Sequence, residues 1–336
     1  MALQSSGQIT FTNIRNEFGE STNNKIGSYR VSQNIGDMTN IPLDNGIPSS
    51  GQIRFSDFYG KKLNVVVHYS TDENRPDEAR LRYNSDTEVT VIGEFRDKPA
   101  NSSGTKVIIH VSSTLGSVQG ARESCALRTG AGWNSGTDLN IEIGYEAVVS
   151  GAGGNGGAGA GEGRENHTDG GNGTSAIGLQ YQVNSINVQD GGIVQGGGGG
   201  GAGGSGDIEG EEDTTGAGGG GGAGIPFGTA GRYGNGRENG STFDGGNGGD
   251  GATEEGAIGG GGGGGGATYG TFGAAGRNRG ASNGSATQGG DGGKAPGFTR
   301  REGGINGYSI TTSNGISLPT ITGNVYGSQS AGTGVQ

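Results

Sequence analysis

The chain has 336 residues, of which 83 are glycine and only 28% are hydrophobic. Glycine loses the most backbone entropy on folding and has no side chain to bury, so this composition excludes one ordinary hydrophobic core for the whole chain. The formal net charge of -11 disfavours nucleic acid and anionic lipid as partners. With no signal-peptide pattern and no apolar run of membrane-spanning length, we expect neither conventional secretion nor membrane insertion.

Residues 1–61 are predicted to form a small attachment module with an internal repeat. The segment SSGQITFTNI at 5–14 returns as SSGQIRFSDF at 49–58. In each copy an Ile-x-Phe pattern predicts a strand, and the Thr-Asn or Ser-Asp pair after it is expected to cap a helical turn, with Ile14 and Phe18 on one face. So little apolar material favours packing on a neighbour. The residues expected to make the attachment are Ile9, Phe11, Ile14, Ile53, Phe55 and Phe58.

Residues 62–148 have the pattern of a normal β domain. Polar, turn-rich segments separate the β-type runs, which lie at 63–69, 79–83, 88–95, 106–111 and 139–145. Their branched and aromatic residues predict a small antiparallel β-sandwich. Trp133 is expected to fill its core or edge, the alternative being a stacking platform for a sugar. The single cysteine, Cys125, excludes an internal disulfide and is expected to be a small buried hydrophobe.

Residues 149–336 are dominated by glycine. The glycine runs lie at 151–163, 196–206, 216–224, 245–251 and 256–266. Charged and aromatic segments interrupt the runs, which a flexible linker would not show, and the Gly-x-y period of collagen is absent. With a linker and collagen excluded, the remaining ordered structure is a set of polyglycine-II helices. In these helices the N–H groups point outward and pair with carbonyls of antiparallel neighbours, and close packing requires glycine. The sequence therefore predicts a bundle of such helices, as a monomer, with loops at both ends.

Short β-like stretches interrupt this glycine-rich part of the chain. They lie at 176–182, 185–189, 193–195 and from 308 to 325. Their alternation suits a sheet or ladder, which we expect to close the base of the bundle. The entry, middle and exit of the bundle would then lie near the β domain. The predicted fold class is mostly β and irregular structure, with an attachment module, a sandwich and a glycine bundle.

Three stretches carry a family resemblance. MALQSSGQI at 1–9 with SDFYGK at 56–61 resembles the N-terminal module of tailed-phage virion structural proteins. RTGAGW at 128–133, leading to VVSGAGGNGG at 148–157, and GGDGGKAPG at 289–297 are similar to the segments that open and close the glycine-rich domain of phage tail-fibre adhesins. In T-even-like tip adhesins that domain is a polyglycine-II sandwich whose distal loops bind the bacterial receptor. Those adhesins dock through a different N-terminal domain, so the mounting point is left open.

The resemblance implies that the segments between glycine runs carry recognition, as loops on a rigid scaffold do. The segments are 164–169, 207–215, 226–244, 267–279 and 296–302. They combine aromatic and arginine side chains, which supply most of the energy in many interfaces. The expected receptor contacts are Arg164, Asn166, His167, Glu209, Glu211, Phe227, Arg232, Tyr233, Arg237, Phe243, Tyr269, Phe272 and Arg277. The alternative is that the aromatic residues cap the ends of a bundle without a core.

Motifs for catalysis or cofactors are weak. A G-x-G-x-x-G match at 151–156 is expected by chance in so glycine-rich a chain, and no amphipathic helix follows it. GGNGGD at 245–250 is a lone calcium-type repeat, and the acidic segment at 207–213 favours a solvated loop over a cation site. His68 and His110 lie in β-type runs without a catalytic constellation. We expect no enzyme activity, no cofactor and no bound metal.

Two functions are compatible with these observations. The first is a virion adhesin of the phage tail, which binds a bacterial protein or glycan receptor and other virion proteins through residues 1–61. The second is a purely architectural virion protein, such as a head fibre, decoration protein or tail adaptor. Variation concentrated in the segments between glycine runs would favour the first. Ice binding is a weaker third reading, because regular Gly-x-x spacing and disulfides are missing.

Overall fold

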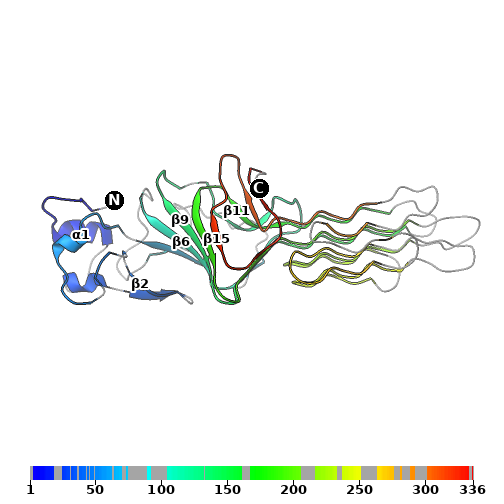
Figure 1. Cartoon of the computed structure of the whole chain (residues 1–336), viewed down its shortest axis with the longest axis horizontal. Coiled ribbons are helices and arrows are strands. Elements are labelled where there is room, and N and C mark those ends of the chain that lie inside the picture. Colours follow the sequence, from blue (N-terminus) through cyan, green and yellow to red (C-terminus); the bar gives the residue numbers. More distant parts are fainter. Residues whose placement is uncertain are drawn as a thin grey trace, which may run out of the picture.

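A computed structural model shows an elongated molecule in which an N-terminal module, a β-rich body and a glycine-rich bundle follow one another along the long axis (Figure 1). The structure describes residues 3–18, 25–30, 32–35, 38–42, 44, 46–48, 50–62, 64–69, 73–74, 89–91, 104–131, 133–160, 167–205, 216–232, 237–250, 263–275, 281, 288–291, 301–332 and 335. The β-like run predicted at 79–83 lies outside these residues.

The N-terminal module places the two copies of the repeat in equivalent local structures. Its elements are α1 (Phe11–Phe18), η2 (Ile26–Arg30), β1 (Ser32–Ile35), β2 (Met38–Pro42) and η3 (Phe55–Phe58). The N–H of Thr10 donates to Oδ1 of Asn13 over 2.8 Å, and the N–H of Arg54 donates to Oδ2 of Asp57 over 2.6 Å. These caps confirm the predicted helical turns. The predicted Ile-x-Phe strands are not formed, because each phenylalanine is the first residue of a helix.

Aromatic residues from α1, η2 and η3 form the core of this module. Tyr29 makes edge-on contacts with Phe18 and Phe58, at ring-centroid distances of 6.2 and 5.9 Å. The cluster extends to Ile108 on the β-rich body, so the module packs on a neighbour as its composition predicted. The residues expected to make the attachment divide by burial: Ile9, Ile14 and Phe58 are buried, Phe11 and Ile53 are half-buried, and Phe55 is exposed.

The β-rich body consists of strands from both sides of the first glycine run. They are β3 (Val65–Tyr69), β4 (Glu73–Asn74), β5 (Val89–Val91), β6 (Lys106–Val111), β7 (Thr114–Gly116), β8 (Cys125–Arg128), β9 (Asp138–Ile143), β10 (Val148–Ser150), β11 (Ser175–Leu179), β12 (Val183–Val188), β13 (Ile193–Gln195), β14 (Ile310–Thr312), β15 (Thr320–Thr322), β16 (Val325–Tyr326) and β17 (Gln329–Ser330). Strands that follow the first glycine run pair with strands that precede it. The β-rich and glycine-rich parts therefore alternate along the sequence.

Three sheets in this body form a solenoid. The described strands of the first sheet have the order β15-β12-β9-β6-β3-β5, those of the second β16-β13-β10-β7-β4, and those of the third β17-β14-β11-β8. From β6 onward the chain visits the first, second and third sheet in turn and then starts the next coil. Neighbouring strands are therefore parallel, apart from β5 at one edge. The predicted antiparallel sandwich is wrong, because the chain turns onto the next face instead of reversing.

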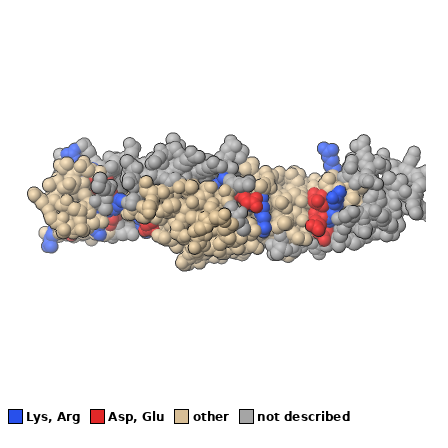
Figure 2. All heavy atoms as spheres, turned by 90° about the horizontal axis from the view of Figure 1, so that it is seen from above, with Lys and Arg blue, Asp and Glu red and all other residues tan. Residues whose placement is uncertain are grey.

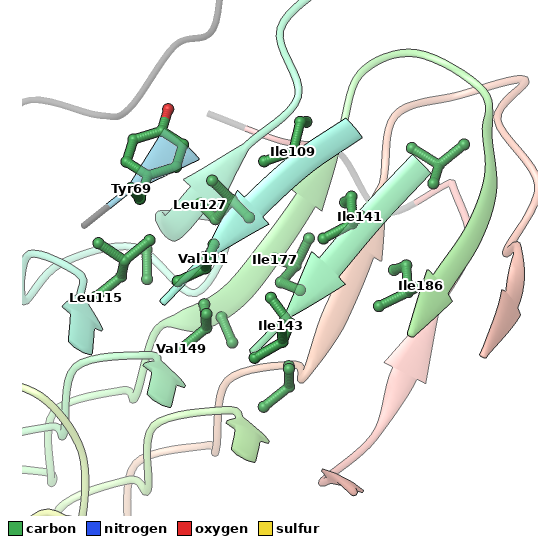
Figure 3. Packing of buried hydrophobic residues seen from close by; sticks show 14 of the residues in the cluster. Tyr69, Ile109, Val111, Leu115, Leu127, Ile141, Ile143, Val149, Ile177 and Ile186 are labelled. Atoms are coloured by element: carbon green, nitrogen blue, oxygen red, sulfur yellow. The ribbon is translucent and has the colours of Figure 1, made fainter. Parts of the chain in front are cut away.

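The solenoid encloses one hydrophobic core. In β9 the side chains alternate, so that Leu139, Ile141 and Ile143 point inward and are fully buried. Figure 3 shows Ile141 and Ile143 of β9 facing the same interior as Val149 and Ile177 from the other two sheets. Side chains from all three faces thus fill one interior.

Several residues singled out in the sequence have packing roles in this body. Trp133 is buried in the core, and its Nε1 donates to the carbonyl oxygen of Thr129 over 2.7 Å, which confirms the core role. Cys125 is buried, as predicted. The rings of His68 and His110 stack at 5.0 Å between centroids on neighbouring strands.

The glycine-rich runs are insertions at one corner of the solenoid. Residues 151–174 connect β10 to β11, and residues 196–309 connect β13 to β14, so both leave the second sheet and return to the third. In Figure 1 the described runs extend away from this corner, opposite the N-terminal module. We call them the glycine bundle: 151–160, 167–174, 196–205, 216–224, 228–232, 237–240, 245–250, 263–267, 272–275, 288–291 and 301–307.

Backbone hydrogen bonds with a period of three residues join neighbouring runs. The N–H groups of Gly154, Gly157 and Ala160 donate to the carbonyls of Gly198, Gly201 and Gly204, over 2.8, 2.8 and 3.1 Å. Other N–H groups of 196–205 donate to different neighbours, for example Gly201 to Gly220. Each run is therefore held by several others rather than by one strand partner on each side.

Candidate functional site

The two ends of the glycine bundle differ in their contacts. At the near end, turns at 225–227, 241–244 and 268–271 are hydrogen-bonded to the solenoid or to the first residues that leave it. The N–H of Ser117 donates to the carbonyl of Ile225 over 2.9 Å, Nε2 of Gln195 donates to Thr242 over 2.7 Å, and Oγ1 of Thr268 donates to Gly196 over 2.6 Å. These turns are occupied by intramolecular contacts.

The far end brings together residues that flank several of the predicted recognition segments. The N–H of Gly216 donates to Ala160 over 2.9 Å, and the N–H of Gly159 donates to Arg232 over 3.1 Å. The N–H of Gly203 donates to Thr168 over 3.0 Å. The chain therefore enters or leaves the segments after residues 160, 205 and 232 at one end of the molecule.

Interior and surface runs have different sequences for a steric reason. In the interior run 216–224, a Cβ added to Gly220 would overlap the carbonyl oxygen of Gly246. In the surface run 151–160, the residues at 152, 155 and 158 are not glycine, and Asn155 is exposed. Every third position of a surface run can therefore carry a side chain, whereas interior runs need glycine at nearly every position.

Side chains at these surface positions bond to exposed backbone N–H groups. Oδ1 of Asp169 accepts from the N–H of Glu302 over 3.0 Å, and Oδ1 of Asn172 accepts from the N–H of Ile305 over 2.9 Å. At a surface run the outward N–H has no further run beside it, so an Asn or Asp side chain satisfies it. The runs are thereby held up to their last described residues at the far end.

Only part of the predicted receptor-contact set lies at the far end of the described structure. Arg232 and Arg237 are exposed there, whereas His167 is buried with 4% of its surface accessible. Figure 2 shows acidic and basic side chains together in a band across the bundle toward this end. Six further predicted contacts lie outside the described residues: Arg164, Asn166, Glu209, Glu211, Tyr233 and Arg277.

The predicted aromatic contacts lie at the near end instead. The ring of Tyr269 contacts Phe243 at 5.1 Å and Tyr326 of β16 at 4.3 Å between centroids. Phe227 and Phe272 belong to or follow near-end turns and are exposed. Phe227 and Arg232, which the sequence grouped together, therefore lie at opposite ends of run 228–232.

Asp244 organises one of these near-end turns. Its Oδ1 accepts from the N–H and from Oγ1 of Thr271, both over 2.8 Å, and the N–H of Asp244 donates to Oγ of Ser241. The backbone N–H of Thr271, followed by its hydroxyl, lowers the pKa of the Asp244 carboxyl below its usual range. The carboxylate form thus stabilises the junction of two turns.

Sequence reasoning missed the glutamines at the near end. Gln119, in the link between β7 and β8, donates from Nε2 to the carbonyls of Gly153 and Phe227 over 2.9 and 3.3 Å. Buried Gln195, at the end of β13, bonds Oγ of Ser150 as well as Thr242. Gln195 is followed directly by an unbroken glycine run, and that position is the one signal in the sequence that could have indicated its role.

The described residues contain no cluster of three or more His, Cys, Asp or Glu side chains that could hold a metal ion. In the same part of the chain, no helix combines the length and apolarity needed to cross a membrane. The glycine bundle thus has one end that is bonded to the solenoid and one end that gathers arginine and acidic residues.

Comparison with known proteins gives one family. The model of the family described as phage tail fibre adhesin Gp38 matches residues 78–335. Among solved structures, the chain is similar to the gp37-gp38 adhesin tip complex of the bacteriophage S16 long tail fiber, with 14% identity and a TM-score of 0.33, over 85% of this chain and 90% of that chain. A search of curated proteins finds no match.

Proposed function

Because the chain belongs to the phage tail fibre adhesin family Gp38, we propose that it binds a bacterial surface receptor through the far end of its glycine bundle. Membership places the protein in the virion tail. The observation that carries the proposal is the difference between the two bundle ends: near-end turns are bonded to the solenoid, and the far end gathers the boundaries of several non-glycine segments. Recognition residues commonly lie on such loops over a rigid scaffold.

The scaffold in this proposal is a bundle of polyglycine-II helices. Three features support this assignment: hydrogen bonds between runs with a period of three, donation from one run to several neighbours, and glycine positions where a Cβ would overlap a carbonyl. Such helices have no internal hydrogen bonds, so every bond contributes to cohesion between runs. The bundle can then hold its far-end segments in place without a hydrophobic core.

Arg232 and Arg237 are the described residues that we propose as receptor contacts, together with the predicted residues of the neighbouring segments. Arginine suits carboxylate and phosphate groups, which occur in bacterial surface glycans and proteins. The near-end aromatics Phe243 and Tyr269 are proposed to join the bundle to the solenoid, consistent with their contacts to each other and to Tyr326.

We assign attachment to the virion to the N-terminal module. Phe11 from the first copy of the repeat and Phe55 from the second contact each other at 6.3 Å between ring centroids. Phe55 is exposed, and Phe11 and Ile53 are half-buried, so these three offer an apolar surface to another virion protein. Buried Ile9, Ile14 and Phe58 hold the module together.

The test is competition for adsorption. The purified chain, added in excess to susceptible bacteria, is expected to block adsorption of the phage that encodes it. The double variant Arg232→Ala and Arg237→Ala is expected to block less well, whereas Tyr145→Ala, which removes an exposed side chain on the solenoid, is the matched control. A folded chain that does not block adsorption would leave only the architectural role in the tail.

A further inference from the structure

The run 228–232 has a register that its backbone hydrogen bonds do not specify. It lies beside 151–160, and the bonds repeat every three residues: Gly153 to Pro226 at 2.8 Å, Gly156 to Thr229 at 2.7 Å and Gly159 to Arg232 at 3.1 Å. A shift of the run by three residues, roughly 9 Å in polyglycine-II geometry, would re-form equivalent bonds. The observed register must therefore be selected by contacts outside this repeat: the backbone bonds of Ile225, in the preceding turn, to Ser117 and Gly151, and side chains along the run.

The solenoid fixes the register of some runs but not of this one. Run 151–160 follows β10 directly, and 167–174 precedes β11 directly, so parallel sheet pairing sets their positions. Run 228–232 follows the near-end turn 225–227 rather than a strand, and in that turn the backbone of Ile225 is bonded to Ser117 after β7 and to Gly151 after β10. Its position depends on contacts with its neighbours.

A pair of amide side chains contacts this run at one point. Oδ1 of Asn155 accepts from the N–H of Thr229 over 2.9 Å and from its Oγ1 over 3.0 Å. Gln119 donates from Nε2 to Oδ1 of Asn155 over 3.0 Å, and Nδ2 of Asn155 donates back to Oε1 of Gln119 over 3.2 Å. Gln119 also bonds the carbonyls of Gly153 and Phe227. The pair thus joins the solenoid, run 151–160 and the start of run 228–232.

We propose that Asn155 and Gln119 form a latch that sets the register of run 228–232. In the observed register Asn155 meets Thr229, which provides two donors. A shift of the run by three residues toward the far end would put Pro226 at that place, and proline has no N–H. The opposite shift would put Arg232 there, which has a backbone N–H but no hydroxyl. Only the observed register gives Asn155 both bonds.

The latch lies at the near end of the bundle, but it determines the position of residues at the far end. Run 228–232 leads into the segment that starts after Arg232 and ends at Arg237. Moving the run by one triplet would displace Arg232 along the bundle, whereas Arg237 begins the separate run 237–240. Asn155 and Gln119 are therefore positioning residues for a recognition segment that they do not touch. This consequence rests on the proposed function, whereas the latch itself does not.

The register can be measured by disulfide trapping. Ala158 lies opposite Arg232, since the next residue, Gly159, donates to the Arg232 carbonyl. The pair Ala158→Cys and Arg232→Cys reports the observed register, and the pair Ala158→Cys and Thr229→Cys reports the register shifted toward the far end. Buried Cys125 stays in place. Each pair is oxidised mildly in the full chain with and without Asn155→Ala, and the crosslinked fraction is measured on a non-reducing gel.

With Asn155 present, the 158–232 crosslink is expected to dominate. Asn155→Ala is expected to shift the ratio of the two crosslinks about tenfold toward 158–229, as the loss of two net hydrogen bonds implies. Asn155→Asp keeps the acceptor oxygens and is expected to retain the original ratio. Asn172→Ala is the matched control, because it also removes one side-chain bond to a backbone N–H but lies between runs that the third sheet fixes.

An unchanged ratio in Asn155→Ala, and in the double variant with Gln119→Ala, would overturn the proposal. So would the loss of both crosslinks, because Asn155 would then be needed for the run to form rather than for its register. Adsorption blocking is measured separately on the same variants. A shifted crosslink ratio with unchanged blocking would leave the latch standing and count against receptor contact by Arg232.

Discussion

At the scale of single residues, the corner between the first and second sheets repeats one backbone conformation. Glu146 has φ of 56°, Gly191 has φ of 74° and Gly323 has φ of 87°, and each lies in the turn that leads to β10, β13 or β16. Glycine adopts this left-handed region freely, whereas a residue with a Cβ is strained by about 1 kcal/mol or more.

Replacing Glu146 by glycine is therefore expected to stabilise the protein by about 1 kcal/mol. Gly191→Ala at the equivalent corner is expected to destabilise it by a similar amount, because the added Cβ is also close to the Glu146 side chain. Urea denaturation of both variants measures the change. Equal stability of the two variants would show that this corner tolerates a Cβ.

Asp244 predicts the direction of a pH effect. Its folded-state pKa lies below the ordinary value because it accepts hydrogen bonds from Thr271. Its contribution to stability is therefore present above the unfolded pKa and is lost as the pH falls through the folded pKa. The near-end turns are expected to loosen in acid, measurable as lower amide protection factors at 268–271 after division by the slower intrinsic exchange rate at low pH. Asp244→Asn is expected to lose most of this pH dependence, and Asp190→Asn, at an exposed solenoid position, is expected to keep it.

At the scale of elements, the space around each position of the interior run 216–224 determines whether alanine fits there or only glycine. Ala217 and Ala223 are buried within it, whereas Gly220 midway between them would overlap Gly246 if it had a Cβ. Gly220→Ala is expected to lower the free energy of unfolding by roughly 3 kcal/mol, because backbone on a neighbouring run cannot move aside easily. Ala223→Gly is expected to cost about 1 kcal/mol. Thermal unfolding followed by circular dichroism should rank the two; the reverse order would contradict the steric account.

Some structural elements could be predicted from the sequence, and others were missed. The strands at 106–111 and 193–195 and the helical caps of the repeat follow from local pattern, and the structure contains them. The sequence also contained a sign of parallel pairing. NIEI at 140–143 is followed by a second strand and then by glycine, and SINV at 185–188 is followed in the same way. In the structure these two segments pair side by side in parallel. Two similar strands with similar followers indicate successive coils of a solenoid, which the sandwich interpretation overlooked.

The arrangement of the bundle ends could not be predicted from the sequence. Glycine triplets are equivalent to one another, so composition does not say which run neighbours which or where a turn lies. Phe243 and Arg237 are close in sequence, yet Phe243 is at the near end, in contact with Tyr269, and Arg237 is toward the far end. The side chains that resolve this ambiguity, such as Gln119 and Asn155, are ordinary polar residues whose role depends on their partners.

At the scale of the whole molecule, the solenoid and the bundle are separable. The corner that carries the glycine runs is also crossed by shorter links, 117–124 between β7 and β8 and 327–328 between β16 and β17. A coil of this solenoid therefore closes without a glycine run. Replacing both 151–174 and 196–309 by copies of 117–124 is expected to give a shorter chain that retains the β-sheet circular dichroism and unfolds cooperatively.

That shortened chain separates the two proposed binding roles. It keeps the N-terminal module, whose core extends to Ile108 on β6, and lacks every residue proposed to contact the receptor. It is expected to compete with the full chain for incorporation into the virion while failing to block adsorption. An insoluble or unfolded product would mean that the period-three contacts of the bundle are needed to hold the solenoid together. A folded product that still blocks adsorption would move receptor binding from the bundle to the solenoid or the module.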